Sequence, residues 1–558
     1  MKERYLEECE FSSYEDMRNR FRFRIPDNFN FGFDVVDAWA DEEPEKRALV
    51  WANPQGEERT FTFTDIKRLS NQTVNYLKRV GVKKGDVVML VLKRRWEYWV
   101  ISVACHKLGA IALPVNHLMK KKDFSYRISK ARVSCVFCVN EEMAIRELEE
   151  SIAHDAPHIT NKIVVQSPRE GWAYFDDCIA GESDVFERPT GAEATQNDDT
   201  MLMYFTSGTT GMPKLLPHNY LYPLGHIITA CYWQCVQNNG LHLTVADTGW
   251  AKTGWGKIYG QWIGGTANMV YDFDRFHADE ILSLIEKYKL TTFCAPPTVY
   301  RFIIKEDLSK YDFSSLTHCC TAGEALHSEV FNAFEKATGH KIYEGFGQSE
   351  GVVLLATFPG VTPRPGSMGK PSPAYDIRLL DENLKEVEVG QEGLLAVKVD
   401  DEYPVGLFKG YLFDLDDQEE RFRGGYYFTG DMAWRDEMGY YWFVGRSDDV
   451  IKSSGYRIGP FEIESVLMQH PSVLECAVTG APDPIRGQVV KATIKLAKGY
   501  EPSDELSKEL QEFVKKNTAP YKYPRLFDYV DELPKTFSGK IRRKVIRERD
   551  NMDTNPNQ

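Results

Sequence analysis

The sequence predicts an α/β fold in which most strands are parallel. Short β-branched runs such as VVMLVL (Val87 to Leu92), VSCVFCV and KIVVQS have the length and composition of buried strands. Between such runs lie segments with helical spacing of apolar residues. In TDIKRLSNQTVNYLKRVGV we expect Thr64 to cap the helix and Gly81 to end it. Strands that alternate with helices are typical of layered α/β domains.

Chain length and a change in the pattern of predicted helices and strands divide the chain into a large and a small domain. Its 558 residues exceed a single compact domain of about 100–200 residues several times over. Near Gly445 a strand- and turn-rich stretch gives way to a helix, strand, strand, helix unit of about 110 residues. We expect layered α/β subdomains plus a small β-barrel-like subdomain in residues 1–447, and a small α+β domain in residues 448–558.

Composition and charge argue against several classes of protein. The net charge of -14 disfavours general nucleic-acid binding, which requires a basic face. The first residues, MKERYLEECE, lack the apolar core of a signal peptide. The most apolar runs have the length of strands and are too short to span a bilayer. We therefore expect a cytoplasmic protein without membrane insertion.

The cysteines do not suggest a disulfide framework. The chain has 11 of them, an odd number that is scattered over its length. Cys135 and Cys138 form one C-x-x-C, which is compatible with a zinc or redox site. We favour a buried strand that carries two small residues, because no second pair completes a zinc shell.

The stretch YFTSGTTGMPK, from Tyr204 to Lys214, has the composition of a loop that binds phosphate. Gly208 and Gly211 allow a close approach of the backbone to a ligand, and Lys214 adds a positive charge. The hydroxyl-bearing residues between them add hydrogen-bond donors. The stretch lacks the G-x-x-x-x-G-K-[ST] pattern of a Walker A loop, and by itself it is equally compatible with a surface turn.

This stretch closely resembles the phosphate-loop signature of the adenylate-forming superfamily, which contains acyl-CoA synthetases, luciferases and the adenylation domains of peptide synthetases. Five further motifs match in the order that the superfamily has them: TAGEAL (321–326), YEGFGQSE (343–350), YYFTGD (426–431), GRSDDVIKSSGYRIGPFEIE (445–464) and PKTFSGKIRR (534–543). Six motifs in order make the resemblance specific, and they cover most of the chain.

The resemblance implies a site for ATP and AMP. Its residues would be Thr206, Ser207, Gly208, Thr209, Thr210, Gly211, Lys214, Gly323, Glu324, Ala325, Glu344, Gly345, Phe346, Gln348, Ser349, Asp431 and Arg446. Phe346 offers a flat face for adenine, although a core position is the commoner fate of a phenylalanine. Ser349 would donate to the α-phosphate, and Glu350 would hold Mg²⁺. Asp431 would accept hydrogen bonds from the ribose hydroxyls.

The resemblance also assigns roles in the C-terminal part of the chain. Lys540 would enter the site and orient the carboxylate substrate against the α-phosphate, whereas a lysine at a loop tip is otherwise simply solvated. Asp448 matches the hinge about which a mobile C-terminal domain rotates between two half-reactions. Coenzyme A would bind at Gly455, Tyr456 and Arg457. The substrates are then a carboxylic acid, ATP and coenzyme A.

The identity of the acid depends on the acyl pocket. Gly347 lies where acetate-specific relatives have a tryptophan, so we expect the pocket to admit more than acetate. Trp250 and Trp255 would wall the pocket, and Lys252 and Cys294 could line it. The pattern looks most like the medium-chain acyl-CoA synthetases, so we expect a short-to-medium-chain acid, branched acids included, with aryl acids such as benzoate as the alternative.

Other functions stay open at this point. An adenylating enzyme could load its acyl group onto a carrier protein, but no carrier domain follows the lysine motif. A non-catalytic sensor on the same fold is disfavoured because Glu350, Asp431 and Lys540 are all present. The sequence leaves the oligomeric state undecided, with a homodimer as one candidate.

Overall fold

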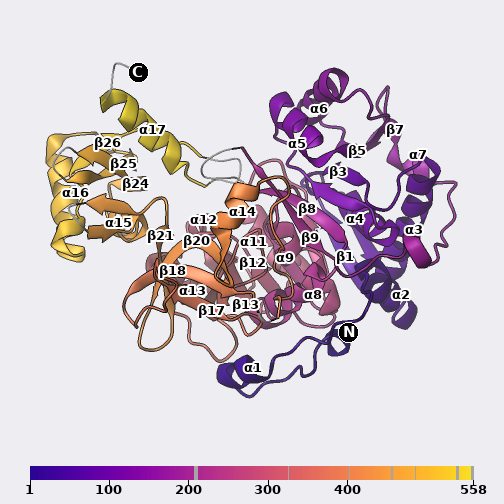
Figure 1. Ribbon diagram of the computed structural model, residues 1–558, viewed down its shortest axis with the longest axis horizontal. Helices are drawn as coiled ribbons and strands as arrows, with labels where there is room; N and C mark the ends of the chain where they lie inside the picture. The colour runs from indigo at the N-terminus through magenta and orange to yellow at the C-terminus, as the bar shows by residue number, and fades with distance from the viewer. Residues whose placement is uncertain are drawn as a thin grey trace. The chain divides into compact units, whose positions relative to one another are not determined.

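The computed structural model describes residues 1–206, 212–324, 326–400, 402–453, 456–483, 486–535 and 540–554 (Figure 1). The chain forms two compact units. The first contains Met1–Thr206, Pro213–Asp376 and Val399–Glu419, and the second contains Ile377–Lys398 and the chain from Glu420 on. The predicted boundary between residues 447 and 448 therefore lies inside the second unit, and it stays a prediction about where the chain bends.

One sheet of the first unit has seven strands in the order β7-β6-β5-β3-β4-β8-β9. The strands are β3 (Val87–Val91), β4 (Ile111–Pro114), β5 (Val133–Val139), β6 (Asn161–Val165), β7 (Ala173–Tyr174), β8 (Thr200–Thr206) and β9 (Lys214–Asn219). All neighbours are parallel except the last pair, β8 and β9. The predicted phosphate loop joins β8 to β9, and Thr206 lies opposite Lys214 where the two strands pair.

The strands of this sheet are continuous apolar runs because helices cover them. All five residues of β3 are buried. Both cysteines of the C-x-x-C are fully buried in β5, in agreement with the strand interpretation. The covering helices are α3 (Phe63–Arg79), α4 (Glu97–Leu108), α5 (Lys121–Ala131) and α6 (Glu142–Asp155).

The N-cap prediction for α3 was wrong by two residues. Thr62, not Thr64, caps the helix, since its hydroxyl accepts the Asp65 N–H at 3.2 Å while the Asp65 carboxylate accepts the Thr62 N–H at 3.0 Å. The hydroxyl of Thr64 instead donates to the Pro44 carbonyl oxygen. The predicted end is confirmed: Gly81 follows the helix with φ of +90°, a conformation that favours glycine.

The second sheet of the first unit is mostly parallel, in the order β2-β1-β11-β10-β12-β13-β14-β15-β16. Its strands are β1 (Arg47–Ala52), β2 (Glu58–Thr62), β10 (Leu241–Thr244), β11 (Ala267–Tyr271), β12 (Thr292–Cys294), β13 (His318–Ala322), β14 (Ile342–Phe346), β15 (Leu355–Ala356) and β16 (Ser367–Pro371). Its core includes residues of α11 (Ala278–Tyr288), α12 (Pro297–Ile303) and α13 (Ser328–Thr338).

The second unit contains two smaller sheets. The strand-rich segment forms an antiparallel sheet of β17 (Ile377–Leu380), β18 (Glu392–Lys398), β19 (Phe422–Arg423), β20 (Tyr426–Arg435) and β21 (Tyr441–Arg446). A second sheet contains β22 (Ile451–Ser453), β23 (Tyr456–Ile458), β24 (Val473–Asp483), β25 (Gly487–Leu496) and β26 (Leu526–Tyr529). It is accompanied by α15 (Pro460–Leu467), α16 (Asp504–Asn517) and α17 (Arg543–Thr554). The predicted α/β class with a small α+β C-terminal part is confirmed.

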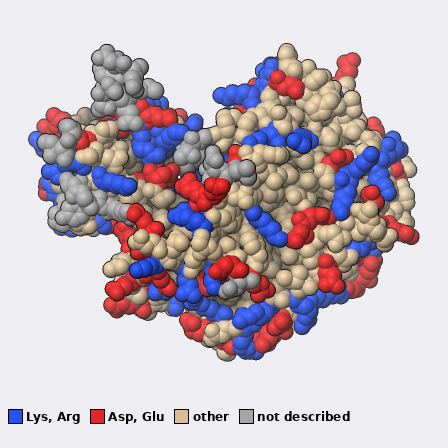
Figure 2. All heavy atoms as spheres, in the orientation of Figure 1, with Lys and Arg blue, Asp and Glu red and all other residues tan. Residues whose placement is uncertain are grey.

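The remaining α-helices have five to seven residues each. They are α1 (Tyr14–Arg20), α2 (Ala38–Glu42), α7 (Phe175–Ile179), α8 (Tyr222–Ile227), α9 (Lys252–Gly256), α10 (Tyr259–Ile263) and α14 (Leu415–Arg421). On the face drawn in Figure 2, acidic and basic side chains are intermixed. In the part of the chain that the structure describes, none of the helices is both long and apolar enough to cross a membrane.

Candidate functional site

Two of the predicted nucleotide motifs meet at one edge of the second sheet. TAGEAL begins with the last two residues of β13, and YEGFGQSE begins within β14. These strands are parallel neighbours in which Thr321 pairs with Glu344 and Ala322 with Gly345. Ligands of α/β proteins bind at the carboxyl ends of such strands. Gly323 leaves β13 with φ of +108°, so the chain turns there in a conformation that favours glycine.

A buried carboxyl group ties this edge together. Glu344 is only 7% exposed, and its two oxygens accept the backbone N–H groups of Leu326 at 3.0 Å and Gly366 at 2.8 Å. Burial raises the pKa of Glu344 to about 8, although both N–H donors favour the ionised form. The side chain of Glu344 thus fixes Leu326, the last residue of TAGEAL, and a second loop at the same end of the strands.

Two glycines of YEGFGQSE make room for tryptophan rings. A Cβ atom at Gly345 would overlap the ring of Trp233, and a Cβ atom at Gly347 would overlap the ring of Trp255. The two indoles meet edge to face with their centroids 6.1 Å apart. The Trp255 N–H donates to the Gly351 carbonyl oxygen at 3.2 Å. The space beside Gly347 is therefore occupied by the wall that Trp255 supplies.

Other predicted pocket residues lie close to this wall. Lys252 shares α9 with Trp255 and is half-buried, and its ammonium group donates to the Ala322 carbonyl oxygen at 3.0 Å. Cys294 ends β12 and is buried, which raises the pKa of its thiol, while the charge of Lys252 acts in the opposite direction. Lys252 thus bridges the predicted acyl wall and the end of β13.

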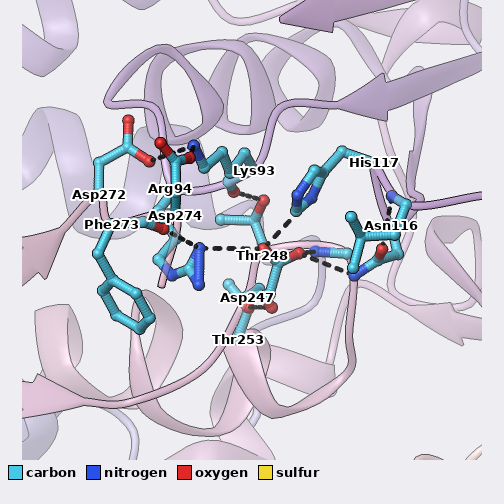
Figure 3. Close-up of polar contacts among 12 residues, drawn as sticks. Lys93, Arg94, Asn116, His117, Asp247, Thr248, Thr253, Asp272, Phe273 and Asp274 are labelled. Carbon is cyan, nitrogen blue, oxygen red and sulfur yellow. Dashed lines mark hydrogen bonds and ion pairs between the residues drawn. The ribbon is translucent and has the colours of Figure 1, made fainter. Parts of the chain in front are cut away.

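A polar cluster fixes the loop that leads into this wall (Figure 3). The Asp247 carboxylate accepts the Gly249 N–H at 3.0 Å, the Asn116 amide at 3.3 Å and the Arg94 guanidinium at 3.5 Å. The Thr253 hydroxyl donates to the Asp247 carbonyl oxygen at 2.9 Å. Because Arg94 follows β3, Asn116 follows β4 and Asp247 follows β10, the cluster anchors the loop to both sheets of the first unit. Trp250, half-buried, lies within this loop.

The residues after Phe346 have partners that the sequence did not reveal. The His218 imidazole donates to the Ser349 carbonyl oxygen at 2.7 Å, and burial lowers the pKa of His218 to about 3, so this ring is neutral. Tyr411 donates its hydroxyl to Glu350 Oε1 at 2.7 Å. Phe346 and Gln348 are half-buried at the same edge.

The second unit carries a buried carboxylate among cations. Asp431 is 3% exposed and pairs with Arg446 at 3.2 Å across β20 and β21. Burial raises the pKa of Asp431, and the charges of Arg446, Arg421 and Lys540 lower it. Arg446 also lies 3.9 Å from Asp448. The structure thus brings four of the predicted residues together and adds Arg421, which no motif marked.

Several predicted residues lie outside the part of the chain that the structure describes. These are Ser207, Gly208, Thr209, Thr210, Gly211, Ala325 and Gly455, together with the side chains of Tyr456 and Arg457. Their roles, like those of the other predicted site residues, stay predictions.

Comparison with known proteins identifies the class to which this fold and these motifs belong. The sequence pattern of the AMP-binding enzyme matches residues 36–412, and that of the AMP-binding enzyme C-terminal domain matches residues 462–540. The chain therefore belongs to the AMP-binding enzyme family. The predicted membership of the adenylate-forming superfamily is confirmed.

Relatives narrow the family further. Acyl-coenzyme A synthetase ACSM3, mitochondrial, of Mus musculus is 40% identical over 550 residues, which are 97% of this chain and 94% of the relative. The human acyl-coenzyme A synthetase ACSM5, mitochondrial, is 40% identical over 533 residues, 94% of this chain and 91% of the relative. The prediction of an AMP-forming acid–thiol ligase, similar to acyl-CoA synthetases, is confirmed.

Solved structures agree with this placement. The anthranilate CoA ligase AuaEII in complex with anthranoyl-AMP matches with a TM-score of 0.85 at 31% identity. The match covers 95% of this chain and 99% of the other chain. A benzoate CoA ligase from Burkholderia xenovorans LB400 matches with a TM-score of 0.79 at 25% identity, over 93% of this chain and 100% of the other.

Substitution of Glu344 by glutamine should weaken the pH dependence of stability. The folded-state pKa of about 8 lies above the ordinary value of 4.5, so the folded protein holds a proton that the unfolded chain releases between these values. The stabilisation is complete below the lower value and is lost as the pH rises through the upper one. Glu344→Gln removes this loss because the amide does not titrate.

The measurement is thermal unfolding followed by circular dichroism at about pH 5.5, 7 and 8.5. The midpoint of the wild-type protein should fall more steeply with pH than that of Glu344→Gln. Glu329→Gln, at an exposed position of α13, is the control and should follow the wild type. Parallel curves for the wild type and Glu344→Gln would contradict the raised pKa.

Proposed function

We propose that the chain is an ATP-dependent ligase that converts a short-to-medium-chain carboxylic acid, branched acids included, into its coenzyme A thioester. The observation that carries the proposal is the match of 97% of the chain to an acyl-coenzyme A synthetase. The clustering of Asp431, Arg446 and the charge of Lys540 supports it, because these residues match the ribose and carboxylate contacts of the motifs.

In the first half-reaction, a carboxylate oxygen of the acid attacks the α-phosphorus of ATP in line and pyrophosphate leaves. Lys540 orients the acid and stabilises the charge that builds on the α-phosphate. The Ser349 hydroxyl donates a hydrogen bond to the same phosphate, and the Asp431 carboxylate accepts hydrogen bonds from the ribose hydroxyls. The product is an acyl adenylate, and no protein nucleophile takes part.

Glu350 suits a magnesium ion that arrives with the nucleotide. The described residues contain no cluster of three ligating side chains for a metal. Magnesium in phosphoryl-transfer sites needs only one or two carboxylates beside the phosphate oxygens, which Glu350 can provide. Bound there, the ion would neutralise charge on the phosphates.

In the second half-reaction, the thiol of coenzyme A attacks the acyl carbon, AMP leaves and the thiol proton passes to solvent. Asp448 is the proposed hinge for the rearrangement between the two steps. Gly455, Tyr456 and Arg457 are the proposed contacts of coenzyme A.

Lys540→Ala should abolish most adenylation. Loss of one group that stabilises the transition state typically lowers kcat by about 10²–10³-fold. Pyrophosphate release with acid and ATP measures this step. Lys544→Ala changes a half-buried lysine that pairs with Glu548 within α17; it is the matched control and should keep wild-type activity.

The same variant separates the ligase from a sensor. A ligase variant should still transfer a pre-formed acyl adenylate to coenzyme A, because that step does not use Lys540. A wild-type protein that binds nucleotide but releases no pyrophosphate with any acid would contradict the enzyme and favour a sensor.

Asp448→Pro should impair thioester formation more than adenylation, because proline fixes φ near −65° where the chain is expected to rotate. Each half-reaction is measured in a single turnover. Asp448→Ala, which removes the carboxylate but leaves the backbone free, should depress the second step less than proline does. Equal losses in both half-reactions would refute the hinge.

Trp255→Ala should shift the preferred acid toward longer chains, because the indole ring fills the space beside Gly347. One methylene in an apolar pocket is worth up to about 3 kcal/mol, so the ratio of kcat/KM for octanoate over butyrate should rise at least about tenfold. AMP release is measured with acids from acetate to decanoate, with 2-methylbutyrate and benzoate included. Trp255→Phe should give an intermediate profile, and an unchanged profile for Trp255→Ala would remove Trp255 from the pocket.

The same set of acids tests two alternative functions. An aryl-CoA ligase is favoured by the similarity to the anthranilate and benzoate ligases, and turnover that peaks with benzoate would establish it. An enzyme that loads a carrier protein would form pyrophosphate at a rate indifferent to coenzyme A.

Three assignments beyond the reaction are also proposals. A role in fatty acid metabolism follows from the proposed acids and is tested by the same panel. A homodimer is tested by light scattering of the purified protein. A cytoplasmic location is tested with a fluorescent fusion, and a mitochondrial signal, as the names of the relatives would suggest, would overturn it.

A further inference from the structure

A short segment of the first unit, Phe408–Leu412, joins two parts of the proposed nucleotide site. At one end, the Phe408 N–H donates to the Glu350 carbonyl oxygen at 2.8 Å. At the other end, the Leu412 N–H donates to the Leu215 carbonyl oxygen at 2.9 Å, directly after Lys214. The segment therefore connects the backbone of the proposed metal ligand with the strand that begins at the loop lysine.

Tyr411 makes the same connection with its side chain. It is 5% exposed, and its hydroxyl donates to Glu350 Oε1 at 2.7 Å. Its ring centroid lies 5.2 Å from the ammonium nitrogen of Lys214. A hydrogen bond from a hydroxyl to a carboxylate is charge-assisted, and an ammonium group over a tyrosine ring is attracted by the ring quadrupole. One residue thus holds an anion and a cation of the site.

We propose that Tyr411 is a positioning residue that sets the orientation of Glu350 toward the magnesium ion of Mg·ATP and the orientation of Lys214 toward the phosphates. The inference rests on the role given to Glu350 under the proposed function. Among the described residues no hydrogen bond reaches Oε2 of Glu350, so with Oε1 held by Tyr411 we assign Oε2 to the cation. If the glutamate side chain is already held in place before the ligand arrives, binding causes a smaller loss of conformational entropy and is therefore stronger.

A neighbouring tyrosine shows that a hydroxyl group in this region can find a backbone acceptor and does not require the Glu350 carboxylate as its hydrogen-bond partner. Tyr403 is half-buried and donates its hydroxyl to the Phe408 carbonyl oxygen at 2.5 Å. A buried tyrosine that only packs would be satisfied by such a backbone acceptor. Tyr411 uses the side chain of Glu350 instead, and Tyr403 provides a matched control.

The test is the affinity of Tyr411→Phe for ATP, measured by isothermal titration calorimetry on the full chain, with excess Mg²⁺ and with EDTA. The substitution removes one oxygen atom and keeps the ring beside Lys214. Affinity in Mg²⁺ should fall about tenfold, the effect of losing a hydrogen bond to a charged group. Affinity in EDTA should not change, and Tyr403→Phe should match the wild type in both conditions.

A double-mutant cycle provides the second measurement. In a Glu350→Gln background, Tyr411→Phe should cause little additional loss of affinity in Mg²⁺, because the two groups act together. Equal losses in Mg²⁺ and EDTA, or the full tenfold loss in the Glu350→Gln background, would overturn the inference alone. A wild type that binds ATP equally well with and without Mg²⁺ would overturn the metal role of Glu350 together with it.

Discussion

The parallel pairing of β13 with β14 is the constraint on which the rest of the predicted nucleotide site depends. It places the first residues of TAGEAL beside those of YEGFGQSE, with Ala322 opposite Gly345. A shift by one residue would turn every side chain of β14 to the other face of the sheet. Glu344 reinforces this register, because its buried carboxyl accepts N–H groups from two loops that leave the edge.

Glycine and tryptophan have complementary roles at this edge. Gly345 and Gly347 are glycines because indole rings lie where their Cβ atoms would be. The backbone of the nucleotide motif is thereby packed directly against Trp233 and Trp255. The predicted nucleotide and acyl parts of the site would share this contact surface, so a change in either ring would shift the strand that carries Glu344.

The sequence was sufficient for most of the fold and for the motif positions, and the limits of that reasoning have physical causes. Periodicity predicts the strands and α3. The T-x-x-D pattern at Thr62 and Asp65 is the signature of a capping box and marks the observed cap, which Thr64 does not form. Tyr411 and His218 could not be found, because each meets its partner across more than 60 residues of chain by tertiary packing, and no local pattern encodes such a contact. The occupation of the space beside Gly347 depends on α9, which is equally remote.

Glu344 of the first unit and Asp431 of the second unit have different electrostatic surroundings, and the difference suits the proposed polyanionic substrate. Glu344 is buried beside neutral N–H donors, and its pKa near 8 leaves it largely uncharged at neutral pH. Under the proposed function it would therefore add little negative charge close to the phosphates of ATP. Asp431 is buried as well, but Arg446, Arg421 and Lys540 oppose the rise of its pKa and favour the ionised form. An ionised carboxylate is the form that accepts two hydroxyl hydrogen bonds from a ribose. Cations thus oppose protonation at Asp431, whereas the groups that lower the pKa of Glu344 are neutral N–H donors.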